Sequence, residues 1–273
     1  MQFSVLMPIY YKENPDFISA ALDSILIQQT VQPTEVIIVE DGPLTPELDN
    51  VVNNYLSKYP QVIKVFKLER NMGMGFAMNF GLHKCNYGWV FRMDSDDIAI
   101  PTRFEEQLVV INTHKYDIIG SAIEEFHHTP GDLRQLRIMP EQHDAVVEFM
   151  KFRNPINHMT VAFRKSLALK ADGYWEKRYF EDYNLWYEMY KVGAKFYNIQ
   201  TPLVNARIGN NMVARRSGYS YYKYEKELNE KFLKDKYITP VEYGLYMSLK
   251  FILRVLPVNM LSWVYKKALR KNF

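Results

Sequence analysis

The chain has 273 residues, 48% of them hydrophobic and 24% charged, and its formal net charge is +3. This is the composition of an ordinary globular protein, and it excludes a mainly disordered chain, a collagen-like repeat and a disulfide-stapled miniprotein. The length suits one large domain or two small ones.

The charge is unevenly distributed along the chain. Residues Tyr243–Phe273 contain six basic side chains and no acidic one, whereas the rest of the chain carries a net charge of −3. An acidic body argues against a general nucleic-acid-binding protein, and a basic, apolar tail favours contact with an anionic surface. The single cysteine, Cys85, cannot form an internal disulfide, and the chain starts without a signal-like segment. We therefore expect a cytoplasmic protein.

Strand-like apolar runs alternate with helical patterns through the first 120 residues, as in a parallel sheet covered on both faces. The predicted strands are Phe3–Met7, Glu35–Val39, Val62–Lys67, Trp89–Met93 and Ile118–Ser121. Helices are predicted to start at Asn14-Pro15, at Thr45-Pro46 and at Pro101, because these residues cap a helix or suit its first turn.

The pattern from residue 122 to residue 218 is less regular. It predicts a helix near Glu141–Lys151, a strand near Met159–Arg164, a helix near Tyr179–Val192 and short strands at Lys195–Ile199 and Leu203–Arg207. No linker interrupts the chain, so residues 1–217 are predicted to form one α/β domain. Its sheet is expected to be mixed and Rossmann-like, with helices on both faces, and residues 218–273 are expected to form a separate helical appendage.

Acidic residues follow two predicted strands at the edge where open α/β sheets bind ligands. Asp41 follows one strand, and Asp94-Ser95-Asp96-Asp97 follows another. Three carboxylates within four residues repel one another unless a cation or solvent separates them. The segment is either a solvated turn or the protein part of a magnesium or manganese site that also binds the phosphates of a nucleotide.

Five segments together resemble glycosyltransferase family 2. They are Ser4–Tyr10 (SVLMPIY), Val39–Gly42 (VEDG), Arg70–Gly73 (RNMG), Met93–Asp97 (MDSDD) and Phe180–Asp182 (FED). The likeness covers residues 3–217 and implies an inverting enzyme with a GT-A fold. Residues 93–103, 158–165 and 181–186 are similar to bacterial transferases that build O-antigen and capsule repeat units.

The resemblance implies a nucleotide-sugar half, residues 1–100, and an acceptor half, residues 101–217. Asp41 would contact the uracil of a UDP-sugar, Asp94 the ribose or the metal region, and Asp96 the metal, Mn²⁺ or Mg²⁺. Asp97 is a second candidate near the sugar or the metal. The remaining nucleotide-sugar candidates are Pro8, Ile9, Tyr10, Asn71 and Ser95, and for Ile9 plain packing in the core is an equal alternative.

On the acceptor side, the resemblance implies that Asp182 is the catalytic base. The alternative for Glu181-Asp182 is an ordinary charge pair stabilised by the dipole at the start of a helix. Further candidates for contact with the acceptor or for a lid are His158, Glu181, Trp186 and Arg207, together with the loop at residues 210–216. His158 is equally suited to orienting a loop, and the loop at 210–216 to simple solvation.

Two other enzyme classes fit the sequence less well. The segment Asn71–Gly75 lacks the third glycine of a dinucleotide loop and follows the third predicted strand, which argues against an NAD-dependent dehydrogenase. No glycine-rich phosphate loop follows the first strand, which argues against a nucleotidyltransferase. The processive synthases of this family carry a glutamine-rich Arg-Trp motif and transmembrane helices. Both are missing from the sequence, so we expect the addition of a single sugar.

The longest uncharged stretch of the tail, residues 255–265, has 11 residues, whereas a membrane-spanning helix needs about 20. The tail and the aromatic, basic segment Tyr219–Tyr224 suit an interfacial position on an anionic membrane. Alternatively, these apolar residues pack on the body or against a second copy, which would make a homo-oligomer.

The sequence thus predicts a metal-dependent glycosyltransferase on the inner face of the cell membrane. The resemblance implies that it moves one hexose, with galactose as the expected sugar, from a UDP-sugar to a lipid-linked oligosaccharide. A non-catalytic nucleotide-binding or scaffold protein is the alternative, but such a protein has no reason to keep both Asp96 and Asp182.

Overall fold

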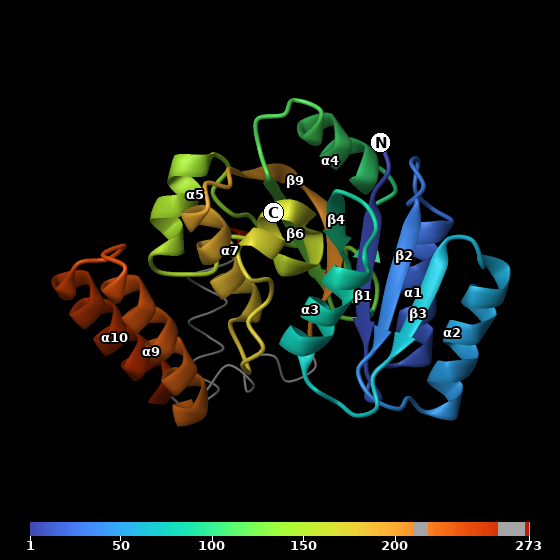
Figure 1. Cartoon of the computed structure of the whole chain (residues 1–273), viewed down its shortest axis with the longest axis horizontal. Coiled ribbons are helices and arrows are strands. Elements are labelled where there is room, and N and C mark those ends of the chain that lie inside the picture. The colour runs from blue at the N-terminus through green and yellow to red at the C-terminus, as the bar shows by residue number, and fades with distance from the viewer. Residues whose placement is uncertain (210–217, 256–270, 273) are drawn as a thin grey trace.

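The computed structural model describes residues 1–209, 218–255 and 271–272 (Figure 1). The first part of the chain contains β1 (Ser4–Ile9), α1 (Pro15–Leu26), β2 (Glu35–Glu40), α2 (Pro46–Lys58), β3 (Ile63–Lys67), α3 (Met74–Lys84), β4 (Trp89–Arg92), β5 (Ile98–Ala99) and α4 (Arg103–Ile111). The second part contains β6 (Ile118–Phe126), β7 (Gln135–Arg137), α5 (His143–Met150), the 3-10 helix η1 (His158–Thr160), β8 (Ala162–Arg164), α6 (Lys165–Lys170), α7 (Glu181–Lys191), β9 (Phe196–Arg207), α9 (Gly218–Lys234), α10 (Pro240–Val255) and β10 (Lys271–Asn272).

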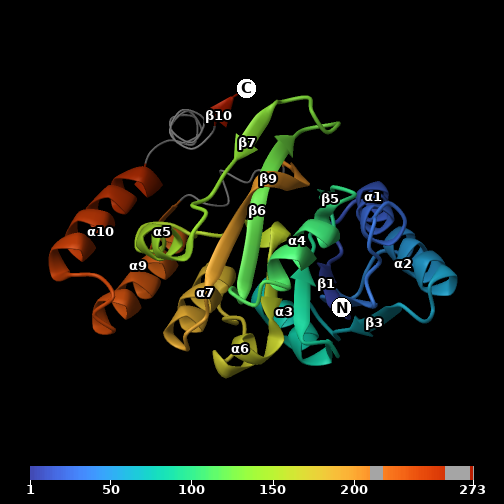
Figure 2. The ribbon, with the colours of Figure 1, turned by 90° about the horizontal axis from the view of Figure 1, so that it is seen from above.

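Within the described residues, ten strands form one mixed sheet (Figure 2). The strand order is β10-β7-β6-β8-β4-β1-β2-β3, and β9 pairs with both β5 and β6. β3, β2, β1 and β4 are parallel, β8 is antiparallel to its neighbours β4 and β6, and β9 runs parallel to β6. The predicted α/β class and mixed sheet are therefore confirmed.

Local sequence signals explain where the first two helices start. The Asn14 side chain accepts a hydrogen bond from the backbone N–H of Asp16 at 2.8 Å, and Pro15 occupies the first turn of α1. The hydroxyl oxygen of Thr45 accepts from the N–H of Leu48 at the start of α2. Each cap satisfies a backbone donor that has no partner inside the helix, as the sequence predicted.

Helices cover both faces of the sheet, and each face has its own core. In β1, Leu6 belongs to the core shared with α3 and α7, whereas Val5 and Met7 belong to the core shared with α1, α2 and α4. This alternation follows from the twofold side-chain period of a strand. Both cores are apolar, so the central strands are buried on both sides, as is usual for parallel strands.

Two predicted details in the second part are wrong. The strand expected at residues 159–164 is the 3-10 helix η1 followed by the short strand β8. The two short strands expected at residues 195–199 and 203–207 form one strand, β9, whose pairing with β6 shifts register on either side of Ala122. The shift absorbs the interruption at Pro202, which has no N–H to donate to a ladder.

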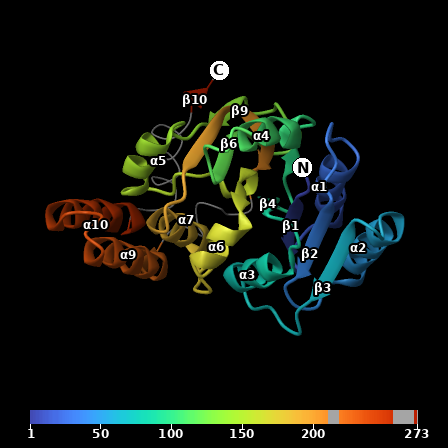
Figure 3. The same cartoon turned by 45° about the horizontal axis from the view of Figure 1, so that its top comes forward.

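The helices α9 and α10 lie side by side at the end of the molecule opposite to β3 and α2 (Figures 1 and 3). Leu228 and Phe232 of α9 are fully buried in the core that contains α7, and the rings of Phe232 and Tyr187 are 4.4 Å apart. The described residues 218–255 are helical, as expected for residues 218–273, and α9 packs on the body through these side chains. Among the described residues, none of the helices combines the length and the apolar character that crossing a bilayer requires.

Candidate active site

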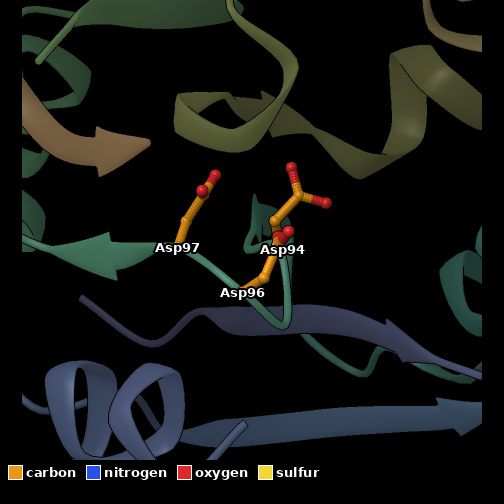
Figure 4. A group of neighbouring side chains, drawn as sticks. All are labelled: Asp94, Asp96 and Asp97. Atoms are coloured by element: carbon orange, nitrogen blue, oxygen red, sulfur yellow. The ribbon is translucent and has the colours of Figure 1, made fainter. Parts of the chain in front are cut away.

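The carboxylate loop, Met93–Asp97, follows β4 and carries three acidic side chains. Asp94, Asp96 and Asp97 place carboxylate oxygens within 4.8 Å of one another. Figure 4 shows Asp94 and Asp97 directed to the same side of this turn. Oxygen atoms at this spacing can share a single hard cation. The structure thus brings together the three carboxylates that the sequence singled out.

The carboxylate loop holds more negative charge than the protein neutralises. Burial raises the pKa of Asp96 to about 6, and the charge of Asp94 adds to this shift. The pKa of Asp97 is raised well above its usual range by burial and by both neighbouring carboxylates. Arg92 of β4, 1% exposed, forms an ion pair with Asp94. The buried Arg103 and the neighbouring Arg207 also act on these carboxylates, but the pKa values of Asp96 and Asp97 stay raised, so positive charge compensates the loop incompletely.

An oxygen atom of Asp97 supports the same conclusion. Its Oδ1 accepts a hydrogen bond from the backbone N–H of Arg207 at 2.8 Å. Its Oδ2 is buried and has no hydrogen-bond partner among the described residues. Buried polar atoms are nearly always paired, so an oxygen of this kind calls for a ligand. A divalent cation such as Mn²⁺ or Mg²⁺ fits this donor set.

Glu13 is a fourth acidic residue at the carboxylate loop, and the sequence analysis missed it. It lies between β1 and α1, where burial and the charges of Asp96 and Asp94 raise its pKa to about 7. Its carboxylate accepts a hydrogen bond from Ser95, which is 4% exposed. The signal that could have found Glu13 is its position just after the first strand, because parallel strands end at one edge.

Arg207, at the end of β9, lies directly against the carboxylate loop. Its Nε donates to the backbone oxygen of Asp96 at 3.1 Å. Its guanidinium carbon is 3.7 Å from the ring centre of Phe17 and 4.5 Å from that of Phe126. The two rings hold the guanidinium through cation–π contacts. The neighbouring loop at residues 210–216, named above as a lid candidate, lies outside the described residues.

Asp41 joins the end of β2 to the loop that precedes α3. Its two carboxylate oxygens accept hydrogen bonds from the backbone N–H groups of Met72 and Gly73, at 2.6 and 3.0 Å. The Asn71 side chain donates to the backbone oxygen of Asp41 at 3.2 Å. A Cβ atom on Gly42 would lie 2.6 Å from the Asn71 nitrogen, so this close approach requires glycine.

The first strand contributes less open surface than predicted. Pro8 and Ile9 are buried within β1, and Ile9 packs in the core with α1, which matches the packing alternative for this residue. Tyr10 is half-buried at the strand end, and its ring lies 5.8 Å from the ring of the exposed Tyr11. Of the three candidates, only Tyr10, which directly follows β1, is partly exposed.

Asp182 lies in the first turn of α7 and is held by Asn154. The Asn154 Nδ2 donates to Asp182 Oδ2 at 2.5 Å, and Asp182 Oδ1 accepts from the backbone N–H of Tyr183 at 2.8 Å. The Asn154 Oδ1 accepts in turn from the N–H of Ile156 at 3.2 Å, which fixes the amide. These donors and the positive end of the helix dipole stabilise the ionised carboxylate. Glu181 precedes Asp182 in the same turn.

An aromatic cluster lies between the carboxylate loop and α7. His158 Nε2 lies 3.1 Å from the Tyr174 hydroxyl, and the Tyr174 hydroxyl is within reach of the charges of Arg92 and Asp182. Burial, with the charge of Arg92, lowers the pKa of His158 well below its usual range, so its imidazole is neutral at pH 7. Trp186 is fully buried against His158 and Tyr174, which contradicts the predicted contact with an acceptor or lid.

Comparisons with known proteins agree with this geometry. The chain matches the family Glycosyl transferase family 2 over residues 4–169. It is 38% identical, over 99% of its length and 97% of the other protein, to the UDP-Gal:alpha-D-GlcNAc-diphosphoundecaprenol beta-1,3-galactosyltransferase of Escherichia coli. It is 35% identical, over 97% of its length and 98% of the other protein, to the amylovoran biosynthesis glycosyltransferase AmsE of Erwinia amylovora.

A solved structure has the same fold. The mannosyltransferase PcManGT from Pyrobaculum calidifontis, in complex with GDP-Man and Mn²⁺, matches with a TM-score of 0.64 at 16% identity. The match covers 98% of this chain and 75% of that one.

Proposed function

Because this chain belongs to glycosyltransferase family 2, we propose that it transfers one galactose from UDP-galactose to a lipid-linked oligosaccharide in the assembly of a surface polysaccharide. The Escherichia coli relative is named for such a donor and for a diphosphoundecaprenol-linked acceptor. The observation that carries the proposal is the uncompensated group of carboxylates in the carboxylate loop. It suits a cation and a nucleoside diphosphate, which a purely structural turn does not need.

The carboxylate loop would hold the metal, with Asp96 as the principal ligand and with Asp94 and Asp97 beside it. When bound, Mn²⁺ or Mg²⁺ acts as a Lewis acid that stabilises the charge developing on the UDP leaving group. Arg207 adds a fixed positive charge next to the diphosphate. Glu13 holds the Ser95 hydroxyl and so keeps the loop in shape.

The uridine part of the donor would bind at the loops that follow β1 and β2. Asp41 and Asn71 tie these loops together, and the Asp41 carboxylate retains acceptor capacity beyond its two backbone hydrogen bonds. Tyr10, at the end of β1, offers an aromatic ring for stacking on the base. Pro8, buried within β1, lies two residues before Tyr10.

Asp182 would act as the base on the acceptor side. In an inverting displacement, the acceptor hydroxyl attacks the anomeric carbon opposite the UDP, and one carboxylate suffices to take its proton. Asn154 positions Asp182 for this step. Glu181 points roughly 100° away around the helix, so the two carboxylates cannot face the acceptor equally.

The reaction places the protein at a membrane, because the proposed acceptor is anchored in one. We propose that it works on the cytoplasmic face, since the excess of basic residues in the sequence from Tyr243 to Phe273 favours anionic lipid.

The decisive experiment measures transfer from UDP-galactose to a synthetic GlcNAc-diphospho-lipid acceptor with Mn²⁺. Asp182→Asn keeps the shape of the side chain but removes its basicity, so transfer should fall by about 10²- to 10⁴-fold while UDP binding persists. Glu181→Gln is the matched control and should cost less. If Asp182→Asn transfers at the parent rate and Glu181→Gln does not, the two roles must be exchanged. Faster transfer from another UDP-sugar would replace galactose but keep the mechanism.

The role of Asn154 has its own test. Asn154→Ala removes a hydrogen bond to an ionised group, so transfer should fall by about 10- to 100-fold. The acidic limb of the pH profile of kcat/KM should also move to higher pH, because the carboxylate loses a donor that favours its charged form. Asn54→Ala, on the exposed side of α2, is the control. A lower rate with an unmoved pH profile would show that Asn154 does not act through Asp182.

A further inference from the structure

The outward face of α10 is apolar. Four side chains spaced four, four and three residues apart lie on one side of this helix, and all are more than half exposed: Val241 (71%), Leu245 (65%), Leu249 (58%) and Ile252 (57%). Phe251, 47% exposed, lies at the edge of this face and contacts the ring of Tyr222. The acidic Glu242, in the first turn of α10, lies beside this face and accepts hydrogen bonds from Thr239.

The two basic side chains of α10 point the other way. Lys250 and Arg254 are 8% and 9% exposed and lie against Glu225 of α9. Arg254 donates to both oxygens of Glu225, at 3.0 and 3.1 Å, and the Lys250 Nζ lies 3.4 Å from Glu225 Oε1. A surface helix of a soluble protein has the reverse arrangement, with its apolar stripe inward and its charges outward.

We propose that this outward face of α10 lies on the surface of an anionic phospholipid bilayer. The inference rests on the proposed function, since an acceptor carried by a lipid requires the enzyme to work at a membrane. Leucine, isoleucine and phenylalanine side chains on one face of a helix are the apolar contacts of an interfacial helix. The exposed Tyr219, at 76%, adds an amphipathic ring in the neighbouring helix α9.

Charge complementarity selects the bilayer over a second copy of the chain. The sequence between α10 and β10 contains Lys266, Lys267 and Arg270 and no acidic residue. An anionic surface attracts such a segment. A homodimer through the same face would instead bring two positive segments together.

The test measures binding of the full chain to sedimenting vesicles of phosphatidylglycerol and phosphatidylcholine. The variant is Leu245→Ser combined with Leu249→Ser. Its matched control is Ile27→Ser combined with Val109→Ser, two side chains that are 57% and 64% exposed elsewhere on the body. The α10 variant should bind about 100-fold more weakly, because each leucine removed from lipid contact costs roughly a factor of ten. The control should bind like the parent.

Several outcomes would overturn the proposal. Equal binding of parent and α10 variant excludes this face, and equal binding to vesicles of phosphatidylcholine alone excludes the anionic requirement. A parent dimer that the α10 variant abolishes, with no vesicle binding, identifies a second copy as the occupant. A lower Tm in the α10 variant with unchanged vesicle binding identifies residues 256–270 as the occupant.

A separate readout distinguishes this failure from failure of the proposed function. Hydrolysis of UDP-galactose and transfer to a water-soluble acceptor should be the same in the α10 variant and the parent, because α10 is not part of the proposed active site. Transfer to a long-chain lipid acceptor in vesicles should fall together with vesicle binding. If the parent binds vesicles through α10 but neither hydrolyses nor transfers galactose, the membrane face stands and the proposed donor is wrong.

Discussion

Two groups of buried charges in this molecule are built in opposite ways. The carboxylate loop places Asp94, Asp96 and Asp97 close together, with Arg92 paired to Asp94, and leaves Asp97 Oδ2 without a partner among the described residues. The pair α9 and α10 places two cations around one carboxylate, Glu225, which both of them contact. In the first group acidic side chains outnumber their ion-pair partner, whereas in the second two basic side chains flank a single carboxylate. The first is therefore suited to an external ligand and the second to joining two helices.

The largest effect is expected when Asp96 is removed from the carboxylate loop. Asp96→Ala should lower transfer by about 10²- to 10³-fold, because the metal loses its principal ligand. The same change should leave the Tm of the metal-free protein unchanged or higher, since it removes one of several mutually repelling carboxylates. The measurements are transfer with Mn²⁺ and thermal unfolding in EDTA, with Asp144→Ala as a control carboxylate on α5. Full turnover of the parent in excess EDTA would remove the metal from the mechanism.

Removing the charge of Glu225 should lower the stability of the protein, in contrast to the removal of Asp96. Glu225→Gln leaves Lys250 and Arg254 buried without their carboxylate, and breaking a buried ion pair in this way costs about 3 to 5 kcal/mol. Transfer to a soluble acceptor by the molecules that remain folded should be unchanged. Chemical denaturation and hydrogen exchange of α10 measure the loss. Glu230→Gln, in the exposed pair with Lys226, is the control and should change nothing measurable. A stable Glu225→Gln protein would show that the buried pair does not hold α10.

Protonation of His158 adds a positive charge beside the carboxylate loop, and a smaller effect on stability is expected from it. The pKa of His158 is held well below its ordinary value, so the unfolded chain takes up a proton before the folded chain does as the pH falls below about 6.5. Stability should therefore fall toward acidic pH, by at most about 1.4 kcal/mol per pH unit for one group. Tm values of the parent and of His158→Gln at pH 5, 6 and 7 measure this. Identical slopes would assign the acid sensitivity to other groups.

The sequence predicted those parts of the site whose residues lie close together along the chain. Asp94, Asp96 and Asp97 lie within four residues after a strand, so any turn there gathers them. Glu13 and Asn154 were missed because their contacts arise from tertiary packing, between segments 82 residues apart for Glu13 and Ser95 and 28 residues apart for Asn154 and Asp182. No local pattern marks such a pair in one sequence.

The errors in the tail and in α7 have a common cause. Lys250 and Arg254 were counted among the charges facing a membrane, but α9 supplies Glu225 and turns both inward. Trp186 was placed beside the acceptor because of its neighbours in the sequence, but the helix directs it into the core. Residue type and spacing identify an amphipathic helix, whereas the neighbouring element decides which face is buried.

The hydrogen bond between Asp97 and Arg207 also affects the order in which the molecule assembles. These residues are 110 positions apart, and β8 must insert between β4 and β6 before that edge of the sheet is complete. β1, β2 and β3 pair with near neighbours in the chain and can form early during synthesis, whereas contacts of long sequence separation form late. A nascent chain would thus complete β1, β2 and β3 well before Arg207 can reach the carboxylate loop. The carboxylate loop therefore gains its contact with β9 only after most of the chain has been synthesised.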